Sequence, residues 1–496
     1  MKHKKAKNLF FISLICLAVI FFFKSAFSIN FFLDDFFFLK VGHASTIIEF
    51  LQFFNPNKDY FYRPIPTEVF YYILGLAHYN LFFAHSLVFC IYFVGLVYLF
   101  KSIYLVTKNK LFSYLSVFLF SIHLTRVFQL YQLATFIEIA LFSFLTISFF
   151  YYLKNKYIVS SIFFILALMS KETAVLFPLL LCTYELTKHY IENHKITFNI
   201  KLLKSNKARI GMMYGLFALF FVVLYKLGVS NVTTIDTYRI QLNSRLILNN
   251  SMWYTLWVFG FPNFLPVYMT SIFSPPLPEF WKILKTHEAS MYFYSLLLFY
   301  SLFIPTFFLM IWYKRKEIIN HILLIVVFLF LHLLFIAPTL PIIHRWMVRL
   351  TVPSVFISIL QAMVIYFAIK KSAVTRGIAV CLIILYISYN FYGIKVHESS
   401  SLFFLESRIV SNATTYFSNH NDSIQNRNNI YFLETKPSSW GGSKKLKVSL
   451  HDQSFLNYYF PQKQMKVIYE SDSIPAPILL PNTYVVESDD IIEGRN

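Results

Sequence analysis

Long apolar runs recur along the sequence, and they constrain the fold more than any other feature. Runs of about 18 or more apolar residues are long enough to cross the hydrocarbon core of a bilayer, and several occur within the 496 residues. A membrane β-barrel would need apolar and polar residues to alternate, which they do not do here. The sequence therefore predicts an all-α polytopic integral membrane protein.

Clusters of lysine and arginine indicate how the chain crosses the membrane. The net charge of +20 would favour nucleic-acid binding in a soluble protein, but here the basic residues flank apolar runs. Such clusters mark the cytoplasmic ends of membrane spans, so we expect membrane lipids as partners and no nucleic acid. The clusters lie around residues 2–7, 101–110, 154–156, 188–209, 314–316 and 370–376.

Each interval between two cytoplasmic clusters must hold an even number of membrane crossings. Counting them predicts about eleven transmembrane helices, with a cytoplasmic N-terminus and an extracytoplasmic C-terminus. The first apolar run is too long for a typical signal peptide, and we expect it to stay as the first helix. The transmembrane domain is expected over residues 1–396, with a first external loop at about 30–80.

Two intervals depart from simple pairs of long spans. The interval 157–187 is expected to hold two short helices that turn at Lys171 and Glu172. The segment 229–290 is expected to lie mostly outside the membrane, with an interfacial or re-entrant stretch at 251–273.

The tail, residues 397–496, is polar and contains no further span. Alternating apolar residues in "NNIYFLET" and "MKVIYES" predict short strands, and "FLESRIVSNATTYFSNH" predicts a helix. We expect a small extracytoplasmic α/β or α+β domain of about 100 residues, which is an ordinary domain size.

The predicted topology brings unusual polar residues to the outer face of the membrane. Ionisable residues at the edge of a membrane are candidates for function. Taken singly, each has a structural explanation, since aspartates can mark the water boundary, arginines can anchor headgroups and a loop ion pair contributes little. Their convergence from several loops favours a site. Its members are Asp34, Asp35, Tyr60, Arg63, His123, Lys171, Glu172 and Arg345.

These residue types suit one kind of chemistry. Nucleotide donors are absent outside the membrane, so a transferase there needs a membrane-borne activated donor, such as a polyprenyl-phosphate sugar. Arg or Lys can bind its phosphate and stabilise charge on the leaving group. A carboxylate can act as general base toward the acceptor. The sequence requires no cofactor, and Asp34 and Asp35 would be the ligands if a divalent metal ion is used.

Several segments resemble the GT-C superfamily of membrane glycosyltransferases. "FFLDDFFFL" is similar to the acidic motif of their first external loop, and "LALMSKETAVLFPLLL" resembles the "KE…P" signature of the protein O-mannosyltransferase-like and TMTC-like branch. "DYFYRPIPTEVFYYILGLAHYNLFFAHSL", "FSIHLTRVFQLYQ" and "HRWMVRLTVPSV" resemble further segments of that branch. The resemblance is good over residues 1–190 and thin afterwards.

The resemblance implies a GT-C helical bundle that uses a lipid-phosphate sugar donor and usually inverts the anomeric centre. Asp34 or Asp35 would be the base, while Arg63, Lys171 and Arg345 would be candidates for the donor phosphate. Glu172 would orient Lys171, and Tyr60 and His123 would be further substrate-binding residues. The chain lacks the tetratricopeptide repeats of the TMTC-like proteins, so the acceptor, whether lipid, glycan or protein, is left open.

Two alternatives remain. An O-antigen polymerase or ligase also acts on polyprenyl-linked glycans outside the membrane, and the late segment holds Arg239 and Arg245 that could serve it. A lipid-linked glycan flippase or transporter would place charges in the middle of the membrane and show repeated halves. Abundant Phe, Lys, Asn and Ile indicate an AT-rich genome, so we expect a bacterial inner or plasma membrane and a role in the cell envelope.

Overall fold

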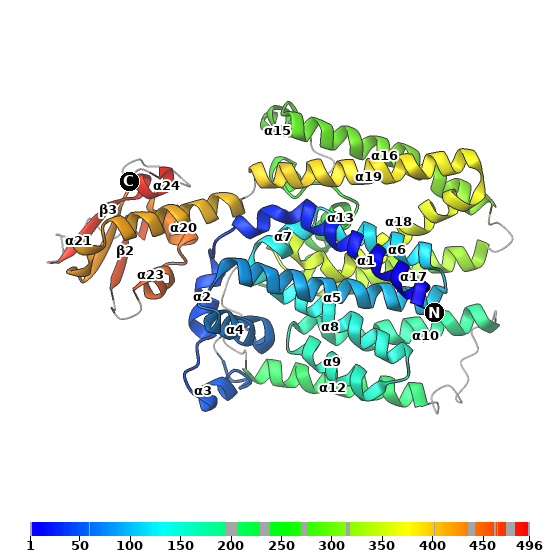
Figure 1. Ribbon diagram of the computed structural model, residues 1–496, viewed down its shortest axis with the longest axis horizontal. Helices are drawn as coiled ribbons and strands as arrows, with labels where there is room; N and C mark the ends of the chain where they lie inside the picture. Colours follow the sequence, from blue (N-terminus) through cyan, green and yellow to red (C-terminus); the bar gives the residue numbers. More distant parts are fainter. Residues whose placement is uncertain are drawn as a thin grey trace.

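The protein is mostly helical and carries a small three-stranded sheet near its C-terminus (Figure 1). The computed structural model describes residues 2–58, 60–193, 206–228, 239–269, 275–313, 318–400, 402–434, 442–460, 463, 465–472 and 482–494. Among them, seven helical segments are long and apolar enough to cross a membrane: Phe10–Ser28, Leu81–Thr107, Leu133–Leu153, His287–Tyr313, Ile319–Thr339, Met347–Lys371 and Ala373–Ser399. The length and composition of these helices support a polytopic helical membrane protein.

These segments belong to a bundle of roughly aligned helices (Figure 1). Some of its helices, α6, α9, α10 and α12, fall outside the seven candidates because they are too short or not apolar enough. The bundle helices are α1 (Lys2–Phe23, continued by η1, Lys24–Ser28), α5 (Leu81–Thr107), α6 (Lys110–Ser121), α8 (Phe136–Leu153), α9 (Tyr157–Leu168), α10 (Phe177–Asn193), α12 (Asn206–Gly228), α16 (His287–Tyr313), α17 (Ile318–Ile336), α18 (Thr351–Lys371) and α19 (Ala373–Ser400).

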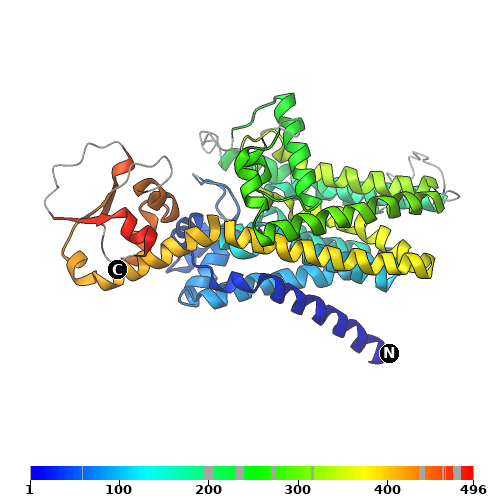
Figure 2. The same cartoon turned by 90° about the horizontal axis from the view of Figure 1, so that it is seen from above.

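Short elements connect the bundle helices. Among them, α2, α4 and α7 lie at the end of the bundle that faces the sheet, whereas the N-terminus lies at the opposite end (Figures 1 and 2). The connecting elements are α2 (Asp34–Val41), α3 (Ile47–Gln52), the π-helical turn η2 (Ile65–Val69), α4 (Phe70–Leu76), α7 (Arg126–Tyr131), η3 (Leu133–Thr135), η4 (Glu172–Leu176), α13 (Ser244–Val258), α14 (Leu265–Tyr268), α15 (Pro278–Leu284), η8 (Ala337–Thr339) and η9 (Met347–Leu350).

Close helix packing in the bundle depends on small residues. A Cβ at Gly95 of α5 would lie 2.6 Å from both the Phe142 ring and Ser143 Oγ of α8. Ser143 uses this approach to donate a hydrogen bond to Ile91 O (2.9 Å). Small residues that let backbones approach and hydroxyls that bond across helices are typical of helix pairs in membranes.

The C-terminal region contains a parallel sheet. Strand β1 (Asn429–Leu433) lies in the middle, between β2 (Lys466–Tyr469) and β3 (Thr483–Glu487). Helices surround it, as parallel strands require: α20 (Leu402–Asn419), α21 (Asn421–Gln425), α22 (Ser443–Ser449), α23 (Ser454–Tyr459) and α24 (Ser488–Glu493), with η10 (Glu470–Asp472). β1, β2 and α20 fall on the segments for which strands and a helix were predicted.

The structure refines the expected boundaries. Helices α9 and α10 are separate, with η4 between them at Lys171 and Glu172, as predicted. The stretch 251–273 begins inside α13, a helix of 15 residues that is not among the candidate spans, and its last residues, 270–273, lie outside the described residues. Helix α19 continues through the expected boundary at 396/397 to Ser400.

Candidate functional site

A strained turn sets the positions of the two aspartates. Asp35 N donates to Phe32 O (3.2 Å), and Leu33 between them has φ 53° and ψ −128°. Glycine usually occupies this backbone conformation, and a non-glycine residue held there costs about 1–3 kcal/mol. Immediately after Leu33 the chain enters α2, so Asp34 and Asp35 leave the turn in different directions.

Asp35 points inward and is fully buried. Its carboxylate accepts hydrogen bonds from the Tyr71 hydroxyl (2.6 Å) and from Phe32 N (3.0 Å). Burial raises the pKa of Asp35 to about 7, although the bonds from Tyr71 and Phe32 lower it, as does the backbone of Ala134. The buried carboxylate therefore connects the start of α2 to α4 and to the segment that precedes α8.

Asp34 points outward, with 52% of its side chain exposed. Its Oδ1 lies 3.7 Å from Nε2 of His451, which comes from the C-terminal region. The backbone makes the same connection, since Leu33 N donates to Ser449 O (3.2 Å). Of the two aspartates, Asp34 is the one whose carboxylate an external molecule can reach.

Tyr60 belongs to a buried network around Glu68. Glu68 lies in the π-helical turn η2 and is fully buried. It accepts hydrogen bonds from the Tyr60 hydroxyl (2.9 Å) and the Thr67 hydroxyl, and it forms an ion pair with Lys58. π-Helical turns occur frequently at functional sites. Tyr60 is thus held by a carboxylate and does not stand free in the loop.

Arg63, which precedes η2, and Glu172, at the start of η4, join two turns that are far apart in the sequence. Arg63 Nε donates to Glu172 Oε2 (3.0 Å) and Nη2 donates to Oε1 (2.9 Å), a bidentate pair between residues 109 positions apart. Burial alone would raise the pKa of Glu172, but the charges of Arg63 and Lys171 hold it below its usual value. The two side chains are 15% and 34% exposed, so the pair is partly accessible from outside.

Lys171 has a different partner from the expected one. Its ammonium group forms an ion pair with Glu138 in the first turn of α8, and the two side chains are 9% and 4% exposed. Glu172 instead accepts its hydrogen bonds from Arg63, because the backbone at η4 directs consecutive side chains to different neighbours. Instead of the expected pair between Glu172 and Lys171, the structure has two ion pairs: Arg63 with Glu172, and Lys171 with Glu138.

His123 lies in the turn between α6 and α7, beside a buried arginine. Its Nδ1 is 2.8 Å from Thr125 Oγ1, and burial, with the charge of Arg126, lowers its pKa to about 3. Arg126 is fully buried and donates to Ser354 Oγ (2.7 Å) and Leu350 O (3.3 Å). Its Nε and Nη1 have no hydrogen-bond partner among the described residues. A neutral His123 that is buried next to Arg126 suits a structural role better than proton transfer.

Arg345 lies apart from these pairs. It precedes η9, where the neighbouring Arg349 donates to the Tyr254 hydroxyl (3.3 Å) of α13. Burial lowers the pKa of Arg345, and its Nη1 has no hydrogen-bond partner among the described residues. Within the part of the chain that the structure describes, no hydrogen bond or ion pair links Arg345 to Asp34, Arg63 or Lys171.

The structure adds residues that sequence reasoning missed. Glu68, Glu138 and Lys58 complete the ion pairs, and we name the set of Lys58, Glu68, Arg63, Glu172, Lys171 and Glu138 the charge cluster. Glu138 and Glu68 each lie within an apolar stretch of the sequence. A carboxylate in such a stretch needs a partner, and this feature could have identified both residues as candidates.

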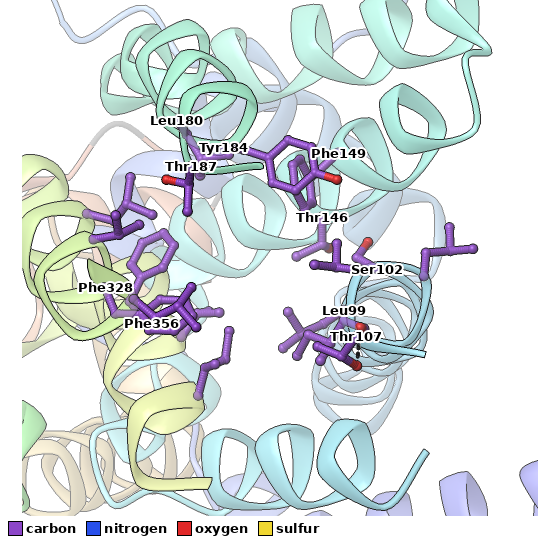
Figure 3. A pocket seen from close by; sticks show the side chains of 18 of the residues that line it. Leu99, Ser102, Thr107, Thr146, Phe149, Leu180, Tyr184, Thr187, Phe328 and Phe356 are labelled. Carbon is purple, nitrogen blue, oxygen red and sulfur yellow. Dashed lines mark hydrogen bonds between the residues drawn. The ribbon is translucent and has the colours of Figure 1, made fainter. Parts of the chain in front are cut away.

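An apolar cavity of about 570 Å³ lies inside the bundle between α5, α8, α10, α17 and α18. Figure 3 shows side chains such as Leu99, Phe149, Tyr184 and Phe356 around an open centre. One end of its lining includes Phe142, one helical turn after Glu138, and Phe177, which directly follows η4. The other end includes Lys108 and Lys188.

The two aspartates do not converge on one point. Asp35 oxygens accept from Tyr71 and Phe32, whereas Asp34 faces His451. In the described ranges, no group of at least three His, Cys, Asp or Glu side chains is arranged to hold a metal ion. A metal bound by Asp34 would need further ligands from the substrate or from water.

The sequence can be compared with known protein families and curated proteins. Neither a comparison with protein-family models nor one with curated proteins gives a match.

Proposed function

We propose that this protein is an integral-membrane glycosyltransferase of GT-C type, which moves a sugar from a polyprenyl-phosphate donor to an acceptor on the extracytoplasmic face. The observation that carries the proposal is the charge cluster, taken together with the accessible carboxylate of Asp34 at the start of α2. Three buried or half-buried ion pairs, two of which join distant segments of the chain, are costly to assemble, and ionisable groups at a membrane edge favour a functional site.

The proposal includes the topology. It assigns about eleven crossings to the bundle helices, with the N-terminus in the cytoplasm and the C-terminal domain outside. The N-terminus and the C-terminal region lie at opposite ends of the bundle (Figure 1), which agrees with an odd number of crossings. The membrane would be a bacterial inner or plasma membrane.

In this proposal Asp34 is the general base. It is exposed, and it can take the proton of the acceptor while the acceptor atom bonds to the anomeric carbon and the bond to the phosphate breaks. The leaving group is polyprenyl phosphate, and attack opposite to it inverts the anomeric centre. Asp35 holds the turn that presents Asp34, because both of its oxygens are already engaged.

Arg63 is the best-placed residue for the donor phosphate. It is partly exposed, and its planar guanidinium can exchange a bidentate carboxylate for a bidentate phosphate. Lys171 and Glu138 sit behind it and keep the turn at η4 in position. The apolar cavity, which begins one helical turn below Glu138, would accept part of the isoprenoid chain.

The distribution of buried charge favours an enzyme over a transporter. Among the described residues, the buried Asp, Glu, Lys and Arg side chains are Asp35, Glu68, Arg126, Glu138, Lys171 and Glu406. They lie in external connections, in the first turn of α8 or in the C-terminal region, and not in the middle of a candidate span. Transporters place such groups at the midplane.

The test is donor consumption by the purified protein. A panel of polyprenyl-phosphate sugars is offered with envelope glycans and lipids as acceptors, and release of polyprenyl phosphate is measured. We expect the wild type to consume one donor and Asp34→Asn to lose at least about a hundredfold in rate. Equal activity of Asp34→Asn would remove the base assignment. Activity only toward a long lipid-linked glycan would instead indicate the polymerase or ligase alternative, for which Arg239 and Arg245 are both exposed.

A further inference from the structure

A second hollow, larger than the apolar cavity, lies between the C-terminal region and the first external loop. Its volume is about 1460 Å³, whereas small-molecule sites usually measure about 300–1,000 Å³. One wall comes from α2 and the start of α5, and the other from α20, α23 and the start of β2. We call it the interdomain groove. Its size suits a chain of several units better than a single sugar.

The charge of the interdomain groove has one sign. Its ionisable lining residues other than tyrosine are Lys40, His43, Lys463 and Lys466, and no Asp or Glu is among the described residues that line it. Lys40 and Lys466 are exposed and face the hollow from opposite walls. Lys463 already donates to Gln425 O. Two lysines on opposite walls attract a ligand that carries repeated negative charges.

Aromatic rings give the groove a rigid wall. Tyr458 packs against Tyr79 (ring centroids 5.5 Å apart), Phe36 (6.0 Å) and Phe31 (6.4 Å), and all of them line the hollow. The apolar faces of sugar rings can stack on such side chains without large ordering costs. Hydroxyls and amides that match sugar hydroxyls lie beside them: Asn30, Ser411, Thr414, Thr415, Ser454 and Asn457.

The groove leads to the proposed base. Helix α2 begins with Asp34, and its residues Phe36, Leu39 and Lys40 line the groove. On the opposite wall, His451 contacts Asp34, and Ser454, three residues later, lines the groove. A chain that lies in the groove therefore has its end next to the Asp34 carboxylate.

We infer that the interdomain groove binds the acceptor, and that this acceptor is an anionic glycan whose units carry carboxylate or phosphate groups. The inference rests on the proposed function for the identity of the ligand as acceptor. The C-terminal region would then take part in acceptor binding, because it forms one wall of the groove and supplies His451, the neighbour of Asp34.

Binding can be tested without any donor. A fluorescent hexamer of galacturonic acid is titrated with the purified full-length protein, and fluorescence anisotropy reports the affinity. A glucose hexamer of the same length serves as the neutral ligand. We expect the acidic hexamer to bind at least about tenfold more tightly, since a charge-assisted hydrogen bond contributes on the order of one factor of ten. Raising the salt concentration should weaken its binding.

Variants locate the site. The double variant Lys40→Gln with Lys466→Gln should lose about tenfold or more in affinity for the acidic hexamer. Lys444→Gln, an exposed lysine of α22 that does not line the groove, should bind as the wild type does. Thermal unfolding of each variant checks that the fold is intact.

The possible results separate this inference from the proposed function. Equal affinity for both hexamers, no measurable binding, or wild-type affinity of the folded double variant would each overturn the groove assignment, while donor consumption could still support the enzyme. Selective binding that depends on Lys40 and Lys466, in a protein that consumes no donor, would uphold a glycan-binding groove and count against the transferase.

Discussion

The ion pair between Lys171 and Glu138 offers the sharpest test of how the charge cluster is built. Both side chains are almost fully withdrawn from solvent, at 9% and 4% exposure. Replacing Glu138 with Gln leaves the ammonium group of Lys171 buried without its carboxylate. An uncompensated buried charge costs about 3–5 kcal/mol, so Glu138→Gln should lower the free energy of unfolding by that amount.

A double-mutant cycle isolates the pair. Lys171→Met fills a similar volume without charge, so the double variant with Glu138→Gln should regain most of the lost stability. We expect a coupling energy of about 3 kcal/mol. The chain supplies its own control in Lys188 and Glu192, which are 3.8 Å apart and 42% and 60% exposed. An exposed pair of this kind should couple by only about 0.3–0.5 kcal/mol.

The measurement is reversible unfolding in dodecyl maltoside by added dodecyl sulfate. Tryptophan fluorescence is a suitable signal, because Trp253 and Trp257 are buried. A Lys171–Glu138 coupling as small as that of the exposed control would refute a buried, stabilising pair. So would single variants that both unfold like the wild type, since a buried pair cannot lose one partner without cost.

The remaining predictions concern the site and the topology. Arg63→Lys should weaken donor binding about tenfold, because an ammonium group cannot form the bidentate contact made with Glu172; an unchanged KM for the donor would contradict this. The pKa of Asp35 is raised from 3.8 to about 7 by burial, so the folded protein holds this proton more tightly than the unfolded chain does. Its contribution to stability is therefore full below about pH 4 and lost as the pH rises through about 7, and Asp35→Asn should abolish that slope in unfolding free energy against pH. In a variant without native cysteines, Ser45→Cys should react with an impermeant maleimide in intact cells and Lys154→Cys only after lysis; the reverse pattern would invert the topology.

The arrangement of the candidate site could be predicted only in part. Charges near apolar runs stand out in a sequence, and they indicated Asp34, Asp35, Arg63, Lys171 and Glu172 as candidates. Their partners were not, since a sequence does not tell which of several carboxylates an arginine will meet. Arg63 meets Glu172 across 109 positions, and Lys171 meets Glu138 across 33.

The sequence also could not rank the two aspartates. The backbone turn before α2 determines which of the two side chains is exposed. That turn requires Leu33 to adopt a conformation typical of glycine, which the sequence does not predict. Tyr71 and Phe32 then engage Asp35, and the C-terminal region brings His451 to Asp34.

By itself, the sequence determined the helical membrane architecture, the short pair of helices at 157–187 and the segments that become β1, β2 and α20. These features follow from hydropathy and periodicity, which are properties of local stretches of the sequence. The tertiary structure decided the ion pairs of Arg63 with Glu172 and of Lys171 with Glu138, and the exposure of Asp34. It also decided the parallel order of the strands and the groove between the C-terminal region and the first loop. Those features depend on contacts within a few ångströms between distant segments, and only the packing of the whole chain brings these segments together.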